Sequence, residues 1–105
     1  METQALQQEM DAIEQAADQV VAATRKGSVS AELQQKADAF HQLARTKRSL
    51  GDKSALTQAV MEIEKSADQL KAACQQAGSV DPAVQQAVMG AHEKASSLKH
   101  RLQQG

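Results

Sequence analysis

The chain has 105 residues and a formal net charge of −1, which excludes a general electrostatic attraction to nucleic acid or to anionic lipid. Phe40 is the one aromatic residue, and there is one proline. Because aromatic and β-branched residues are scarce beside the many Ala, Gln, Lys and Glu residues, the composition favours helix over sheet. The length predicts a single domain over 1–105 with one modest core.

The first predicted helix covers residues 3–26. Apolar side chains recur along it at alternating spacings of four and three residues, the heptad pattern that gives a helix one apolar seam. This seam consists of Leu6, Met10, Ile13, Ala17, Val20 and Thr24. Gly27 favours a left-handed conformation at the helix end, and Ser30 can cap the next helix.

The second predicted helix follows Ser30 and extends to Leu50. Its seam is less regular, with Leu43 and Leu50 beside the main positions Leu33, Ala37, Phe40 and Ala44. Gly51 is predicted to end this helix as Gly27 ends the first, with Asp52 as the cap of the helix that follows.

The third and fourth predicted helices repeat the heptad seam. The third begins after Asp52, ends before Gly78, and has the seam Leu56, Val60, Ile63, Ala67, Leu70 and Cys74. Asp81 followed by Pro82 predicts the start of the fourth, because proline at the first helical position loses no needed N–H group. The fourth seam is Val84, Val88, Ala91, Ala95, Leu98 and Leu102.

The sequence repeats itself with a period near 50 residues. Residues 55–74 match residues 5–24 at ten of twenty positions without a gap, and His92 later matches His41. Such a period predicts two copies of one two-helix unit, repeat 1 over 3–50 and repeat 2 over 53–103.

The predicted fold is an all-α, up-down-up-down four-helix bundle built from two tandem helical-hairpin repeats, each of which buries the other's seam. The pattern also permits the break between the second and third helices to open, so that two chains exchange hairpins. Alanines beside the seam predict close approach of some helices: Ala5, Ala12, Ala16, Ala23, Ala55, Ala59 and Ala73.

Cys74 is the lone cysteine, which excludes an internal disulfide and fits a reducing compartment. Because it occupies a seam position, it is predicted to pack as a small apolar side chain rather than to act as a nucleophile. The chain shows neither a signal-peptide pattern at its start nor an apolar run that could span a bilayer. The expected location is the cytoplasm.

His41 and His92 lie one residue beyond the seam. Histidines with carboxylates can ligate zinc or iron, and Asp38 shares a helix face with His41. Met89 stands where the second repeat needs the equivalent acid, and neither the first nor the third seam carries an inward Glu. No metal or other cofactor is therefore predicted.

His92 also invites comparison with histidine phosphotransfer domains, which are four-helix bundles of similar size. In those domains a lysine follows the phosphorylated histidine by three residues, whereas Lys94 follows His92 by two and Glu93 adds negative charge. The resemblance is one of fold. A phosphotransfer carrier that uses His92 or His41 is the alternative function.

Cations gather where the second and fourth helices end. In the predicted bundle these ends meet, and together they would form a patch for an anionic partner. The patch consists of Arg45, Lys47, Arg48, Lys99 and Arg101. The competing interpretation is that these cations stabilise the helix dipoles. Nucleic acid is not an expected partner, because no aromatic surface is available for stacking.

The favoured function is that of a small non-enzymatic module, regulatory or chaperone-like, that binds another protein or associates with itself. Alanine-rich seams with Met10, Met61 and Met89 as adaptable contacts suit the binding of a helix in a groove. Polar residues shared by both repeats outside the seam indicate either a face used twice or a recent duplication: Gln8/Gln58, Glu14/Glu64, Asp18/Asp68 and Gln19/Gln69. No membrane partner is expected.

Overall fold

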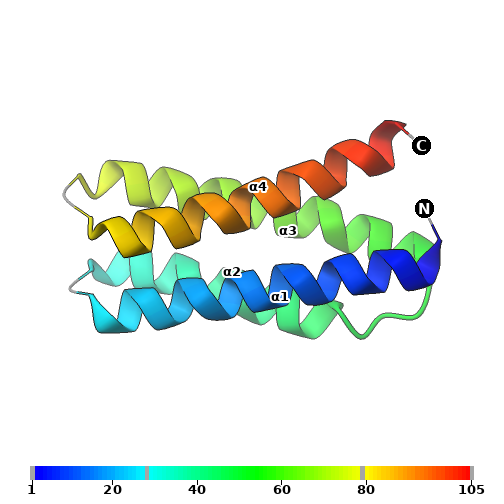
Figure 1. Ribbon diagram of the computed structural model, residues 1–105, viewed down its shortest axis with the longest axis horizontal. Helices are drawn as coiled ribbons and strands as arrows, with labels where there is room; N and C mark the ends of the chain where they lie inside the picture. Colours follow the sequence, from blue (N-terminus) through cyan, green and yellow to red (C-terminus); the bar gives the residue numbers. More distant parts are fainter. Residues whose placement is uncertain (1, 28, 79, 105) are drawn as a thin grey trace.

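The protein is a bundle of four helices in the computed structural model, which describes residues 2–27, 29–78 and 80–104. The helices are α1 (Thr3–Lys26), α2 (Ala31–Lys47), α3 (Lys53–Gln76) and α4 (Pro82–Gln104). They run alternately up and down, so that the start of α1 and the end of α4 lie at the same end of the bundle (Figure 1). Within the described ranges there is no strand. The predicted all-α four-helix bundle is confirmed.

Three helix starts are capped by the residues that the sequence indicated. The caps are Leu33 N–H to Ser30 Oγ at 3.2 Å, Ala55 N–H to Asp52 Oδ2 at 3.1 Å, and Ala83 N–H to Asp81 Oδ1 at 2.9 Å. Each satisfies a backbone donor that the helix itself leaves without a partner. The starts of α2, α3 and α4 therefore follow from local side-chain chemistry, whereas Glu2 at the start of α1 forms no side-chain cap.

The helix ends differ from prediction at two glycines. Gly27 is extended, with φ −89° and ψ 165°, and Gly51 also lacks a positive φ, whereas Gly78 has φ 76°. The predicted left-handed conformation is wrong for Gly27 and Gly51. Gly27 instead continues in extended conformation, while its N–H still donates to Ala23 O at 3.0 Å.

The second helix is also shorter than predicted, because it ends at Lys47 instead of Leu50. Residues 48–49 form a turn, and the Leu50 carbonyl accepts a hydrogen bond from Gln7 Nε2 at 3.0 Å. This bond lets Leu50 pack against the core from outside the helix.

The four seams form one continuous core. Their members are buried, except that Leu102 is only half-buried, and Thr24 satisfies its hydroxyl by donating to Val21 O at 2.9 Å. Cys74 is buried as predicted, and burial raises the pKa of its thiol. No helix in the described part of the chain combines the length and apolar character needed to cross a membrane.

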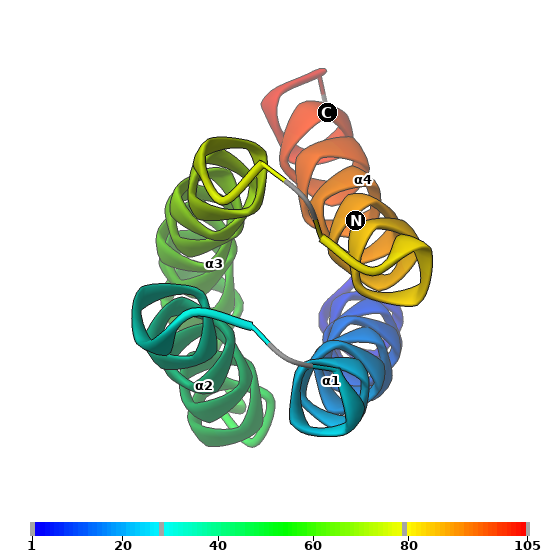
Figure 2. The ribbon, with the colours of Figure 1, turned by 90° about the vertical axis from the view of Figure 1, so that its left-hand side faces the viewer.

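The cross-section of the bundle is a rhombus (Figure 2). Cα atoms of α1 and α3 come within 8 Å of each other across the diagonal, whereas over the described residues those of α2 and α4 do not. The seams of the closer pair carry Ala17 and Ala67, both fully buried. Small side chains at these positions permit the two helices to approach.

Candidate functional site

Each hairpin carries a glutamate, an aspartate and a histidine whose side chains converge. The first carboxylate–histidine cluster is Glu14 and Asp18 of α1 with His41 of α2, and the second is Glu64 and Asp68 of α3 with His92 of α4. Within each cluster the possible ligand atoms all lie within 4.8 Å of one another. The clusters occupy corresponding positions in the two sequence repeats.

The heptad geometry explains why these side chains meet. Glu14 follows seam residue Ile13, and Asp18 comes four residues later on the same helix face. Glu14 and Glu64 are 9% and 8% exposed, so each is almost as buried as the seam. The aspartates lie farther out, with 55% of each side chain exposed.

Each histidine is held by the aspartate of the neighbouring helix. His41 Nε2 pairs with Asp18 Oδ1, and His92 Nε2 lies 2.6 Å from Asp68 Oδ1. Because an ionised carboxylate only accepts hydrogen bonds, Nε2 is the nitrogen that donates in both pairs. This contact fixes the orientation of each ring across its hairpin.

A cation lies beside each buried glutamate. Lys99 Nζ donates to Glu64 Oε1 at 2.9 Å, whereas Arg48 Nη1 lies 3.8 Å from Glu14 Oε2 and is shared with Asp11 at the same distance. Arg48 and Lys99 are related by the same offset as His41 and His92. The second glutamate is therefore more tightly neutralised than the first.

The carboxyl group of Asp68 has its pKa lowered, first by the hydrogen bond with His92 and further by Glu64 and Lys99, against the opposing effect of partial burial. A carboxyl whose folded-state pKa is depressed stabilises the fold above its unfolded pKa of about 3.9, and this contribution is lost as pH falls through the folded value.

We therefore expect Asp68→Asn to reduce the loss of stability that occurs as pH falls from the ordinary carboxyl range through the lowered pKa of Asp68. The measurement is urea unfolding at a series of pH values. His92→Gln, which removes the largest cause of the shift, should flatten the same part of the curve. Undiminished acid sensitivity in both variants would contradict this assignment.

The histidine partners differ from those expected from the sequence. The sequence places Asp38 on the same helix face as His41, but the Asp38 carboxylate accepts a hydrogen bond from Gln34 Nε2 at 3.1 Å, and His41 contacts Asp18 of α1 instead. The seams of α1 and α3 carry no glutamate, but Glu14 and Glu64 are buried directly beside them, where no inward glutamate is expected from the sequence to contribute to a site. The signal that marks the clusters is the identity of these residues in both repeats.

The predicted basic patch is largely matched by carboxylates. Arg45 is exposed at the end of α2 and has Asp18 and Asp38 among its surroundings. The ion pairs of the other four residues are Lys47–Glu62 at 3.7 Å, Arg48–Asp11 and Arg48–Glu14 at 3.8 Å, Lys99–Glu64 at 2.9 Å and Arg101–Glu9 at 2.7 Å. This arrangement does not favour an anionic ligand there.

The surroundings of the two histidines are also unfavourable for a phosphoryl group. Nε2 of each ring already contacts an aspartate, and a glutamate lies within the same cluster. A phosphoryl group on either ring would be placed against two carboxylates, and like charges at such short range repel strongly. The clusters suit a cation better than an anion.

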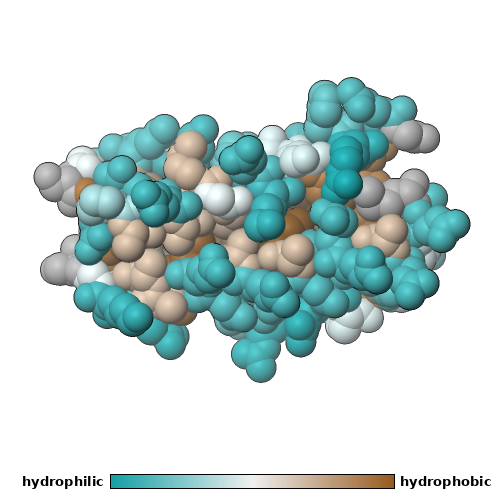
Figure 3. Space-filling view, viewed as in Figure 1, coloured by the Kyte–Doolittle hydropathy of each residue, from teal (hydrophilic) through white to brown (hydrophobic). Residues whose placement is uncertain are grey.

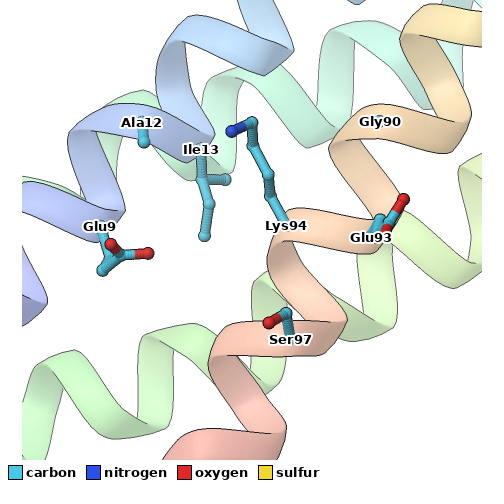
Figure 4. Close-up of a pocket in the computed structure, with 7 residues that line it drawn as sticks. All are labelled: Glu9, Ala12, Ile13, Gly90, Glu93, Lys94 and Ser97. Atoms are coloured by element: carbon cyan, nitrogen blue, oxygen red, sulfur yellow. The ribbon is translucent and has the colours of Figure 1, made fainter.

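A second concave feature lies between α1 and α4. Its walls are Glu9, Ala12 and Ile13 on one side and Gly90, Glu93, Lys94 and Ser97 on the other, around a volume of about 380 Å³ (Figure 4). Figure 3 shows apolar surface between the polar rows of these two helices. We refer to it as the α1/α4 groove.

The methionines predicted as adaptable contacts are placed differently from one another. Met10 is fully buried and therefore not available to a partner, and Met61 is half-buried. Met89 is 46% exposed, and in the described part of the chain it is the one large hydrophobic side chain that is exposed. It lies on α4 next to Gly90.

Comparison of the chain with protein-family models, with curated proteins and with solved structures finds no match. The two carboxylate–histidine clusters and the α1/α4 groove are the features of the molecule from which a function can be inferred.

Proposed function

We propose that this protein is a non-enzymatic interaction module that docks a helix of a partner protein in the α1/α4 groove. The observation that carries the proposal is Gly90, a glycine inside α4 that the packing of its own chain does not require. A Cβ atom built at Gly90 meets no atom within 4 Å. Glycine inside a helix lowers stability by about 0.5–1 kcal/mol relative to alanine.

Close packing of a partner helix against α4 would explain why position 90 is a glycine. Helices that pack through small residues bring their backbones together, and the groove offers Gly90 opposite Ala12 with Ile13 as an apolar floor. The matching residue in the first repeat is Ala39, so this surface belongs to α4 alone.

The edge of the groove indicates the chemistry of its occupant. Glu9 is paired with Arg101 at 2.7 Å, while Glu93 and Lys94 stand on the opposite wall. A partner helix with small or aliphatic residues facing the floor and charges of both signs at its flanks fits these features. The buried thiol of Cys74 is compatible with the reducing cytoplasm as the place of binding.

Substitutions at Gly90 separate folding from docking. We expect Gly90→Ala to raise the free energy of unfolding by about 0.5–1 kcal/mol, measured by urea denaturation of the isolated protein. Gly90→Leu should fold but lose the partner, because its side chain fills the groove. Ala39→Leu, at the corresponding exposed position of α2, is the matched control and should retain the partner.

The partner is detected by capture from a lysate of the source cells, with light scattering to report self-association. Loss of one captured protein in Gly90→Leu but not in Ala39→Leu supports the proposal. A concentration-dependent dimer abolished by the same substitution would replace the partner helix with a second copy. A strict monomer whose captured proteins are the same in all three forms overturns docking in this groove.

A further inference from the structure

We propose that the two carboxylate–histidine clusters are sites for divalent transition-metal ions of the zinc type, one ion in each hairpin. This inference is independent of the α1/α4 groove, since the clusters lie across α1/α2 and α3/α4. It is based on the donor atoms, their convergence, their charge and their occurrence in both halves of the chain.

The donor set matches the preferences of zinc. Each cluster offers one imidazole nitrogen and two carboxylate oxygens, and three protein ligands with water in the fourth position are a common zinc arrangement. Imidazole also suits cobalt and nickel, whereas calcium and magnesium favour oxygen ligands alone. The histidine therefore selects for the transition metals.

The positions of the donors need only a small adjustment to hold an ion. Two ligands about 2.0–2.1 Å from a tetrahedral ion lie roughly 3.3 Å apart, whereas His92 Nε2 and Asp68 Oδ1 are 2.6 Å apart. The ion would replace the proton between them. Asp68 can supply the movement because 55% of its side chain is exposed, while the buried Glu64 stays as the inner ligand.

The charge of each cluster also favours a cation. With a neutral histidine, the first cluster carries two carboxylates against the shared Arg48, and the second carries two against Lys99. A hydrogen bond between His and Asp would be enough to link the two helices of a hairpin, and it does not need a second carboxylate. The glutamate buried beside each His–Asp pair adds negative charge, which a divalent ion would compensate.

The recurrence of the clusters is an independent observation. Glu14, Asp18 and His41 are each repeated in the second half, as is Gln19, whereas some polar positions around them are not kept. Asp38 corresponds to Met89 and Arg45 to Ser96. The three possible ligands are thus retained together on two helices, while part of the surface around them has changed.

The two sites should differ in affinity. Lys99 hydrogen-bonds Glu64 at 2.9 Å and competes with an ion for its oxygen, whereas Arg48 remains 3.8 Å from Glu14. We expect the first site to bind more tightly. Lys99→Met should strengthen zinc binding at the second site, because it frees the Glu64 oxygen that Lys99 occupies.

Titration calorimetry with zinc chloride at pH near 7 tests the proposal on the full chain. The expected result is two ions per chain, reduced to one by His41→Gln and to one by His92→Gln, with none bound when both are changed. His100→Gln is the matched control, because His100 lies outside the clusters and its ring contacts Gln104. It should still bind two.

Cobalt provides a second readout at the same positions. Cobalt bound by these residues should absorb in the visible range, and the absorption should halve in each single histidine variant. Saturating zinc should also raise the melting temperature, because an ion that binds only the native state stabilises it. Asp18→Asn and Asp68→Asn should weaken binding in the same pattern, should a histidine variant fail to fold as judged by circular dichroism.

Two results would overturn the proposal: no zinc binding by the wild-type chain, or binding that survives the change of both histidines. Either leaves the docking proposal intact, since Gly90→Leu should bind zinc normally and the double histidine variant should keep its partner.

Discussion

Phe40→Ala is expected to lower the free energy of unfolding by about 3–5 kcal/mol, the usual result of truncating a fully buried aromatic side chain. Phe40 is the largest buried side chain and has no exposed surface. It belongs to α2, the shortest helix, which contributes three other buried residues: Leu33, Ala37 and Ala44. Removal of the ring leaves α2 held mainly by two alanines and one leucine.

This loss is large for such a bundle. Domains of this size are stable by about 5–15 kcal/mol, and many of the buried residues here are alanines. Urea denaturation followed by circular dichroism measures the change, with Met89→Ala as the control because Met89 is 46% exposed. Equal effects of the two substitutions would mean that Phe40 does not anchor α2.

Most of the fold can be predicted from the sequence because burial follows the helical period. The heptad spacing of Leu6, Met10 and Ile13 is repeated around Leu56, Val60 and Ile63, and all six are buried. The capping roles of Ser30 and Asp52 can also be predicted from the sequence, because a cap depends on atoms only a few residues away. The bundle follows from these local features and from short connections.

The candidate site is less predictable because its contacts cross between helices. His41 lies one residue beyond the seam, and from the sequence its partner could be Asp38 of the same helix or an acid of another. The rotation and separation of α1 and α2 bring Asp18 to it. Periodicity states which face of a helix is buried, but it does not state which polar flanks meet.

The same limit explains the errors at the helix ends. Gly27 and Gly51 do not need a positive φ, because the path to the next helix continues from them in other conformations, whereas the connection after α3 uses one at Gly78. The direction of the following helix determines which form is required. That direction is a property of the packed bundle and is not contained in the glycine itself.

The rhombic cross-section is likewise not evident from the sequence, since all four seams contain alanines.

The close approach of α1 and α3 across the rhombus leads to the second large expected effect. Ala67→Leu is expected to lower the free energy of unfolding by about 1–3 kcal/mol, because a larger side chain in a packed core forces strained rotamers or backbone shifts. Ala67 is fully buried on α3, the helix that approaches α1 across the diagonal.

A leucine elsewhere on α3 provides the comparison. Ala72 is exposed, so Ala72→Leu should change stability by less than about 0.5 kcal/mol, as surface substitutions usually do. Both variants are measured by urea denaturation beside the wild type. If Ala67→Leu is as stable as Ala72→Leu, the space between α1 and α3 must be large enough for a leucine, which would contradict close packing across the diagonal. A selective loss at Ala67 instead indicates that the diagonal contact is close-packed, and that the seam alanines set the separation of the two helices that carry Glu14, Asp18, Glu64 and Asp68.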